Sequence, residues 1–424
     1  MRYWITFAIL SVGIFTMTNS AAQVPEFPKV EDLPIEKGLH DPFTTFDGKK
    51  ITTPEEWYTI RRPELKNLFQ HYMYGFAPDA PGIEVTLLEE DPNLLDGKAT
   101  YKEIEIRFKG LPDDAPKMRL SLFIPNDRKG PAPVFLGINK CGNHTILEEV
   151  GIEKLDGAYY HESCSKPDYG GQGAKEKFWC VDYLISRGYA LANFHESDID
   201  PDKHDFTDGI HAQYKLPHEP GAQWGTIRAW AWGFHRAVDY LVTDPDINPG
   251  QIAVIGHSRR GKTVLLATAL DERIALVVPH QSGTGGDAIS RDSDQETVKR
   301  INDNFPHWFN DNFTLFNDNE YQMPFDQHLL MTLVAPRPLL DTGGLKDTWA
   351  NYPASLRAIH AASPVYEFLG AKGIVGEGMV NGEEEKITKE NASTIMQFRL
   401  DTKHTLNQDY WAGILDFADI QFGR

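Results

Sequence analysis

The sequence of 424 residues contains few cysteines, fewer basic than acidic residues and, beyond its first residues, no long hydrophobic run. Its three cysteines, Cys141, Cys164 and Cys180, match no zinc-knuckle spacing and allow at most one disulfide, whose partners the sequence does not identify. Lysine and arginine total 42 against 61 aspartate and glutamate residues, so the formal net charge is −19. Because nucleic acids and anionic lipid surfaces are bound by basic patches, this balance argues against both as partners.

The first 22 residues have the pattern of a signal peptide. Arg2 precedes a short apolar run, and Ser20, Ala21 and Ala22 supply the small residues typical of a cleavage site. No later segment approaches the 18 apolar residues of a membrane-spanning helix. We therefore predict that residues 1–22 are removed, that the protein is exported to the periplasm or outside the cell, and that it does not associate with a membrane after cleavage.

The remaining chain is predicted to divide into a lead-in segment, residues 23–98, and a larger α/β domain, residues 99–424, that carries the chemistry. The lead-in begins with a stretch rich in proline and charge. Thr53 and Glu56 then have the spacing of a capping box, which predicts a helix that should be interrupted near Pro63.

The larger domain alternates between strand-like and helix-like segments. Residues 99–108 and 117–125 have the two-residue period of strands and are expected to pair antiparallel. Beyond them strands and helices alternate, which favours a mostly parallel central sheet covered by helices on both faces. Further strands are expected at residues 133–138, 189–194, 252–255, 275–278, 338–340 and 396–400, and helices at residues 224–242, 262–270 and 409–420.

An acidic segment at residues 195–205 raises the question of a metal site. It places Asp198, Asp200 and Asp202 at the spacing of a calcium loop, but Lys203 stands where such a loop needs glycine. The sequence also lacks the His-Glu-x-x-His motif of a zinc hydrolase. We therefore interpret the segment as a solvated acidic loop and expect neither a metal nor another cofactor.

The most informative segment is the turn that follows the strand expected at residues 252–255. Residues Gly256 to Thr263 read Gly-His-Ser-Arg-Arg-Gly-Lys-Thr and satisfy the G-x-x-x-x-G-K-[ST] pattern of a nucleotide-binding phosphate loop. Lys262 would then hold phosphate oxygens and Thr263 a magnesium ion. The predicted export of the chain, the two bulky arginines in the loop and the lack of a convincing magnesium-binding aspartate argue against this interpretation.

A nucleophile elbow is the alternative interpretation of the same turn. A sharp strand-to-helix turn would present Ser258 at the top of the sheet, next to the positive end of a helix dipole. The spacing is G-x-S-x-x-G, not the commoner G-x-S-x-G. Asp347 and His404 follow predicted strands, and the order Ser, Asp, His is that of α/β-hydrolases. The simpler interpretation is that Ser258 only caps a helix and that His404 is a surface residue.

The same turn resembles that of a known family. Gly256-His-Ser-Arg-Arg-Gly-Lys262 is similar to the G-[CH]-S-R-x-G-K nucleophile motif of the glucuronoyl esterases, carbohydrate esterase family 15, which accounts for the displaced glycine. The similarity continues through blocks such as Ser282-Gly-Thr-Gly-Gly and Pro324-Phe-Asp-Gln-His. It implies an α/β-hydrolase fold in three layers. It also implies hydrolysis of the ester between 4-O-methyl-glucuronic acid of glucuronoxylan and an alcohol of lignin, without a cofactor.

The resemblance also implies a role for individual residues. By motif match, Ser258 would be the nucleophile, His404 the base and Arg259 a stabiliser of the oxyanion. Lysine and glutamate side chains can bridge neighbouring sugar hydroxyls, and an indole can cover the apolar face of a sugar ring. By the same match, the residues expected to contact the uronate sugar are Lys262, Glu296 and Trp349. The simpler interpretations are that Lys262 and Glu296 form a surface ion pair and that Trp349 fills the core.

One position departs from the family pattern. Many members carry a glutamate immediately before the Ser-Gly-x-Gly-Gly block, and that acid orients the histidine, whereas this chain has Gln281. Glutamine cannot hold a negative charge, so the acid of the triad should be Asp347, at an alternative position that the family also uses. Asp287 is a weaker candidate.

Two other functions stay open at this point. One is another serine esterase that acts on plant polysaccharide, such as an acetylxylan esterase. The other is a carbohydrate-binding protein that has kept the fold, although an intact Ser258 and His404 argue against it. We expect a monomer whose partners are glucuronoxylan and lignin–carbohydrate esters.

Overall fold

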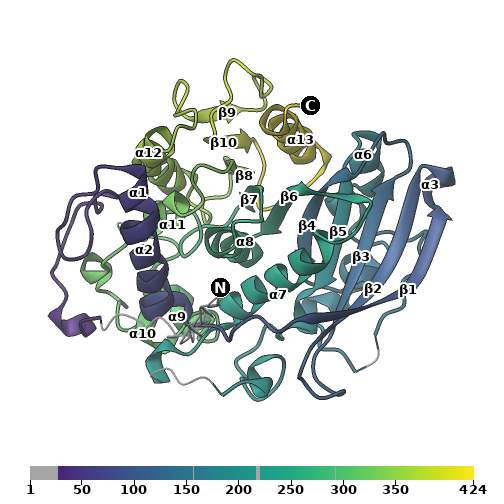
Figure 1. Ribbon diagram of the computed structural model, residues 1–424, viewed down its shortest axis with the longest axis horizontal. Helices are drawn as coiled ribbons and strands as arrows, with labels where there is room; N and C mark the ends of the chain where they lie inside the picture. Colours follow the sequence, from purple (N-terminus) through teal and green to yellow (C-terminus); the bar gives the residue numbers. More distant parts are fainter. Residues whose placement is uncertain (1–26, 156, 216–219, 292) are drawn as a thin grey trace, which may run out of the picture.

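The computed structural model describes residues 27–155, 157–215, 220–291 and 293–424, so the predicted signal peptide lies outside the described residues. Within them, ten strands form one sheet that runs across the molecule, in the order β1-β2-β3-β5-β4-β6-β7-β8-β10-β9 (Figure 1). The strands are β1 (Ile83–Asn93), β2 (Ala99–Phe108), β3 (Met118–Pro125), β4 (Ala132–Asn139), β5 (Ala190–His195), β6 (Ile247–His257), β7 (Leu276–His280), β8 (Leu339–Gly344), β9 (Met379–Asn381) and β10 (Ile395–Leu400).

The sheet has an antiparallel edge and a parallel centre. β1 pairs antiparallel with β2, β2 with β3, and β3 with β5. From β5 through β4, β6, β7, β8 and β10 to β9, each described pairing is parallel. The structure thus confirms the mostly parallel sheet and the antiparallel pairing expected of residues 99–108 and 117–125.

The edge strand β1 was not expected from the sequence. It lies within the predicted lead-in segment, yet it pairs with β2 as part of the same sheet. Val85 and Leu87 are 44% and 52% exposed, so the strand lacks a buried face, and its register shifts between Leu87 and Glu89. The lead-in also contributes Leu65 and Phe69 to the main hydrophobic core.

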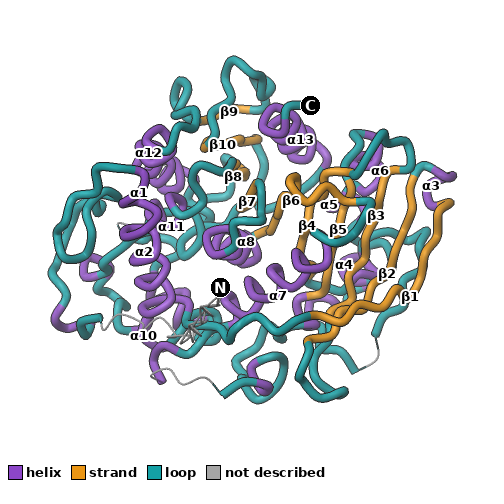
Figure 2. The backbone as a smooth tube through the Cα atoms, viewed as in Figure 1, coloured by secondary structure: helices purple, strands orange, loops and turns teal. Residues whose placement is uncertain are grey.

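Helices cover both faces of the sheet (Figure 2). Neighbouring residues of a strand point to opposite faces. In β6, Ile252 and Val254 join one hydrophobic cluster, which includes residues of α2, α7, α8, α11 and α12. Ala253 and Ile255 join a second cluster with residues of α6 and α13, which confirms the three-layer α/β fold. The helices are α1 (Pro54–Glu56), α2 (Arg62–Phe69), α3 (Leu94–Gly97), α4 (Pro167–Gly170), α5 (Glu176–Trp179), α6 (Val181–Ser186), α7 (Thr226–Leu241), α8 (Arg259–Leu270), α9 (Val298–Asn304), α10 (Asp311–Thr314), α11 (Gln327–Thr332), α12 (Tyr352–Phe368) and α13 (Gln408–Phe422).

The predicted helix after Thr53 is present. The hydroxyl of Thr53 accepts a hydrogen bond from the N–H of Glu56 at 3.2 Å, and the Glu56 carboxylate accepts one from the N–H of Thr52 at 2.9 Å. A π-helical turn, Trp57–Arg61, then separates α1 from α2 immediately before Pro63. Because proline has no N–H to donate, the helical hydrogen-bond pattern changes here without a break in the helix.

The cysteine pairing is also resolved by the fold. Cys141, just beyond the end of β4, forms a disulfide with Cys164, and Cys180 is buried with a free thiol. The disulfide ties the segment after residue 160 to the end of β4. Among the described residues, helices long and apolar enough to cross a membrane are absent.

Candidate active site

Ser258 lies at a sharp turn between β6 and α8. It stands between His257, the last residue of β6, and Arg259, the first of α8, with a φ of 62° and a ψ of −129°. Its N–H donates to the carbonyl of His280 at 2.9 Å, and its side chain forms no capping hydrogen bond with α8. A strained conformation of this kind costs about 1–3 kcal/mol and is typical of a functional turn. The geometry therefore favours the nucleophile elbow over the helix cap.

The displaced glycine of the motif has a clear packing role. A Cβ atom on Gly256 would lie 2.0 Å from the carbonyl oxygen of Arg260, and one on Gly261 would lie 2.7 Å from the Cβ of Ser282. The two glycines therefore let β6, the start of α8 and the loop after β7 approach one another closely. The G-x-S-x-x-G spacing follows from these two contacts.

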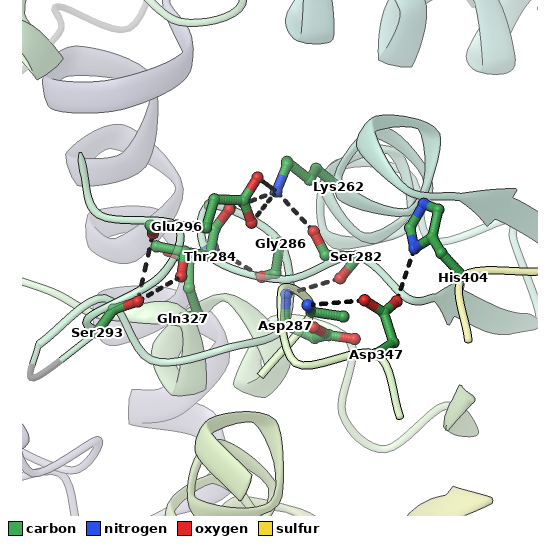
Figure 3. Close-up of polar contacts among 12 residues, drawn as sticks. Lys262, Ser282, Thr284, Gly286, Asp287, Ser293, Glu296, Gln327, Asp347 and His404 are labelled. Carbon is green, nitrogen blue, oxygen red and sulfur yellow. Dashed lines mark hydrogen bonds and ion pairs between the residues drawn. The ribbon is translucent and has the colours of Figure 1, made fainter. Parts of the chain in front are cut away.

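His404 and Asp347 form a hydrogen-bonded pair near this turn (Figure 3). Nδ1 of His404 lies 2.6 Å from Oδ2 of Asp347, and their side chains are 39% and 5% exposed. The His404 ring also packs against His257, the residue before Ser258, with ring centroids 4.2 Å apart. The fold thus brings the three residues expected from chain order to the C-terminal ends of β6, β8 and β10.

The electrostatic state of Asp347 suits an orienting acid. Burial raises the pKa of its carboxyl group, but the hydrogen bond and charge of His404, together with the N–H of Ala350, outweigh burial and hold the pKa below its ordinary value. Asp347 is therefore ionised at neutral pH. With Nδ1 of His404 bonded to this carboxylate, Nε2 is the nitrogen left to accept a proton.

Gln281 and Asp287, the other two positions considered for the acid, have different partners. Gln281 donates through Nε2 to the backbone carbonyl of the residue before His404 at 2.9 Å, and its Oε1 lies 3.0 Å from Nε2 of His257. Burial and a hydrogen bond to Asp341 raise the pKa of Asp287 well above its ordinary value. Gln281 therefore supports the backbone beside the histidine, and Asp287 belongs to a separate buried carboxyl pair.

Arg259 is held on two sides next to Ser258. Its Nη1 donates to Oδ2 of Asp202 at 2.6 Å, and its guanidinium lies 4.3 Å from the ring centroid of Trp308. Asp202 is itself fixed, because Nε1 of Trp308 and Nε2 of His307 both lie 3.0 Å from its Oδ1. Burial opposes the charge of Asp202, but these groups and Arg259 together lower its pKa. The Arg259 guanidinium is thus fixed in place, and Asp202 accepts one of its hydrogen bonds.

The prediction of a solvated acidic loop at residues 195–205 is wrong for residues 195–202, whereas residues 203–205 are partly or largely exposed. Glu196, Asp198, Asp200 and Asp202 are each at most 8% exposed. Buried carboxylates need partners, and these partners come from distant parts of the chain. They are Arg260 for Glu196, the N–H of Arg119 for Asp198, His211 and Thr226 for Asp200, and Arg259 for Asp202.

Lys262 and Glu296 form a buried ion pair on the other side of the loop that follows β7 (Figure 3). Nζ of Lys262 lies 3.1 Å from both carboxylate oxygens of Glu296 and donates to the carbonyls of Ser282 and Thr284 at 2.6 and 2.5 Å. The two charged side chains are 2% and 5% exposed, so the interpretation as a surface ion pair is wrong. Because lysine has three N–H donors, the ammonium group is fully used by these acceptors.

Trp349 lies beside this pair and is not a core residue, since it is 40% exposed. Its indole hydrogen-bonds to Glu296, and the guanidinium of Arg300 lies 5.4 Å from its ring centroid. Burial raises the pKa of Glu296, while Lys262 and the indole N–H oppose the shift. An open indole next to a buried carboxylate can hold a ring that has an apolar face and several hydroxyls.

The same contacts disfavour the phosphate-loop interpretation of the turn. The Lys262 ammonium is directed to the loop after β7, and the Thr263 hydroxyl donates to the carbonyl of Arg259 within α8 at 3.1 Å. Both side chains are engaged with protein acceptors, whereas a phosphate loop presents them to its ligand. Among the described residues, groups of three or more His, Cys, Asp or Glu that could hold a metal ion are absent.

Sequence reasoning missed Asp202 and His257. Asp202 was noticed only as part of an acidic segment, although the adjacent arginines Arg259 and Arg260 were a signal that carboxylate partners were needed. His257 occupies a variable position of the motif, and its contacts with His404 and Gln281 depend on the assembled fold.

Comparisons with known proteins agree with this geometry. A family model described as fungal glucuronyl esterase matches residues 177–370. The carbohydrate esterase MZ0003, from an unknown prokaryotic organism, is 38% identical over 408 residues, which cover 94% of this chain and 90% of that protein. The 4-O-methyl-glucuronoyl methylesterase of Schizophyllum commune is 29% identical over 386 residues, which cover 88% of this chain and 84% of that enzyme.

A solved structure extends the similarity to the whole fold. A promiscuous CE15 esterase from a marine bacterial metagenome superimposes with a TM-score of 0.82 at 36% identity, over 93% of this chain and 99% of that one. Its name places it in carbohydrate esterase family 15. Identity and coverage at this level confirm the resemblance seen in the motifs. The chain belongs to carbohydrate esterase family 15, the family of the glucuronoyl esterases.

Proposed function

We propose that this protein hydrolyses esters of 4-O-methyl-glucuronic acid through an acyl-serine intermediate. The protein is a carboxylic ester hydrolase, and its relatives include proteins named 4-O-methyl-glucuronoyl methylesterase. The observation that carries the serine mechanism is the strained turn at Ser258, next to the hydrogen-bonded pair of His404 and Asp347. Geometry of this kind is what a serine nucleophile needs in order to be activated by a base.

In the first step Ser258 Oγ would attack the uronate carbonyl while Nε2 of His404 takes its proton. The ionised Asp347 would stabilise the imidazolium that forms and hold its tautomer. His404 would then give the proton to the alcohol oxygen as the carbon–oxygen bond breaks, which leaves the uronate bound to Ser258. In the second half-reaction His404 would take a proton from water as the water oxygen attacks the acyl carbon. His404 would then return the proton to Ser258 Oγ as the bond from Oγ to the acyl carbon breaks, which releases the acid.

Arg259 is proposed to stabilise the negative charge that develops on the carbonyl oxygen. Its guanidinium has five N–H donors, and contact with Asp202 leaves some of them available. Asp202 and the ring of Trp308 fix the group before the reaction begins. A cation that needs no rearrangement stabilises the oxyanion more effectively than a mobile one.

The sugar is proposed to lie against Glu296 and Trp349. Since the Lys262 ammonium is already used by protein acceptors, we infer that it acts by keeping Glu296 ionised and in place. The carboxylate would accept hydrogen bonds from ring hydroxyls, and the exposed indole of Trp349 would cover the apolar face of the ring.

The wider setting is part of the same proposal. We infer that the ester links glucuronoxylan to an alcohol of lignin, that the chain is exported, and that it acts as a monomer. The fungal relatives are named for 4-O-methyl-glucuronoyl esters, which supports the acyl side of this assignment.

Ser258→Ala tests the mechanism. We expect kcat on benzyl glucuronate to fall by about 10⁶-fold while binding of the sugar stays nearly intact. Ser186→Ala, at an exposed position of α6, is the matched control and should leave kcat unchanged. Substantial turnover by a contaminant-free Ser258→Ala preparation would contradict the serine mechanism.

Two further measurements separate the alternatives. Faster hydrolysis of an aryl acetate than of benzyl glucuronate by the unmodified enzyme would favour an acetyl esterase. ATP hydrolysis that survives Ser258→Ala but is lost in Lys262→Ala would support the phosphate-loop interpretation.

A further inference from the structure

A cavity of about 250 Å³ opens beside His404, and the residues proposed to contact the sugar do not line it. His404 and His257 form one wall, and residues at the end of β4, in α4, and at the start and within α5 contribute to the others. The side chains that decide its chemistry are Lys140, Tyr169, Lys175 and Phe178.

The cavity and the proposed sugar contacts are built from different residues. In the sheet, β6 stands between β4 and β7. The partners of Lys262 follow β7, whereas Lys140 follows β4 and lines the cavity. His404, the proposed proton donor to the alcohol oxygen, lines the cavity, whereas Lys262, Glu296 and Trp349 do not. An alcohol that leaves next to His404 therefore has the cavity beside it.

The walls of the cavity are aromatic. The Phe178 ring packs edge-on against His257, with ring centroids 5.5 Å apart, and Tyr169 is 38% exposed. The segment that carries Tyr169 is tied to the end of β4 by the Cys141–Cys164 disulfide. The cavity is therefore built into the fold and offers flat apolar surfaces to a ring.

Two ammonium groups share the tyrosine ring. Nζ of Lys175 lies 3.2 Å from the centroid of the Tyr169 ring, and Nζ of Lys140 lies 5.7 Å from it. Within the described residues, neither lysine forms an ion pair with a carboxylate, although Glu196 and Asp202 act on Lys140, and Asp168 acts on Lys175, from a greater distance. Burial and the guanidinium of Arg260 lower the pKa of both ammonium groups to about 8. An anionic group in the cavity would offset both burial and the charge of Arg260 and would keep the two ammonium groups protonated.

We propose that the cavity, named here the leaving-group cavity, binds the alcohol part of the ester and favours aromatic alcohols that carry a carboxylate. The aromatic ring would lie against Phe178 and Tyr169, and its carboxylate would pair with Lys140 and Lys175. The inference rests on the proposed function and specifies the alcohol, which the family assignment leaves open.

The test compares two esters that differ only in one carboxylate group. The kcat/KM values for 4-carboxybenzyl glucuronate, esterified through its benzylic oxygen, and for benzyl glucuronate are measured at pH 7. The unmodified enzyme should prefer the charged ester by about 5- to 10-fold, as expected of a partly exposed ionic contact reinforced by hydrogen bonds. In Lys140→Gln/Lys175→Gln the ratio should fall to about 1.

Both esters react through the same catalytic residues, so an effect on those residues cancels in the ratio of the two kcat/KM values. A variant at a neighbouring lysine controls for a general change of charge. Lys177→Gln removes an exposed charge from α5, two positions after Lys175, and should leave the preference for the charged ester intact. Equal kcat/KM values in the unmodified enzyme, or a preference that survives the double substitution, would overturn the proposal. The proposed function is checked separately by turnover of methyl glucuronate. Absence of that turnover would overturn the proposed function together with this inference.

Discussion

Replacing Asp347 by asparagine is expected to lower kcat by about 10³- to 10⁴-fold, because an amide cannot stabilise the imidazolium of His404. The expected loss corresponds to about 4–5.5 kcal/mol of transition-state stabilisation. The structure supports the upper part of this range. The contact is short, 2.6 Å, and the carboxylate is 5% exposed, so water cannot readily replace it. An asparagine amide could also donate to Nδ1, which would leave the proton on the wrong nitrogen.

Two comparison variants make the assay specific. Asp287→Asn should change kcat by less than about threefold, because Asp287 has a raised pKa and pairs with Asp341 instead of His404, and an amide can replace its hydrogen bond to Asp341. Gln281→Ala removes support from the backbone beside His404 and should cost about 10-fold. All three variants are to be assayed on benzyl glucuronate under single-turnover and steady-state conditions.

The stability of the Asp347→Asn variant provides an independent check. The pKa of Asp347 is lowered in the folded state, so its contribution to stability is present at neutral pH and is lost as the pH falls through that pKa. The difference in unfolding free energy between the two proteins should therefore shrink as the pH approaches 3. A nearly silent Asp347→Asn, or a large loss of kcat in Asp287→Asn, would show that the orienting acid is assigned wrongly.

Three further predictions concern the surroundings of the triad. Methyl glucuronate should be hydrolysed with a higher kcat/KM than methyl galacturonate, because an inverted hydroxyl leaves Glu296 without its partner; equal values would contradict the sugar contacts. Asp202→Asn should lower kcat by about 10- to 100-fold through Arg259, and it should have no further effect in an Arg259→Ala background, whereas additive losses would mean that Asp202 acts independently. Gly256→Ala should destabilise the fold by about 2–3 kcal/mol in urea unfolding, since its Cβ would lie 2.0 Å from a carbonyl oxygen. Gly250→Ala, where the nearest atom is 3.5 Å away, is the control and should be nearly neutral.

Features that depend on neighbouring residues could be predicted from the sequence. The period of apolar residues located the central strands, and the glycines around Ser258 marked the turn after β6. The order of Ser258, Asp347 and His404 along the chain was enough to propose the triad. These signals are local, because strand period and turn geometry follow from a few consecutive residues.

The edge of the sheet shows where local signals weaken. β1 keeps Val85 and Leu87 largely exposed, so its pattern does not distinguish a strand from an extended segment. Its identity as a strand comes from pairing with β2, a partner that the sequence of β1 alone does not specify.

The tertiary structure alone decided which charges are buried and with what partners. Asp202 was predicted to be solvated, yet it holds Arg259, a residue 57 positions away in the chain. Asp347 and Asp287 were both available as the acid, and only the fold places one of them 2.6 Å from His404. The energy of a charge depends on burial and on the partners within a few ångströms, and the packing of distant segments sets both.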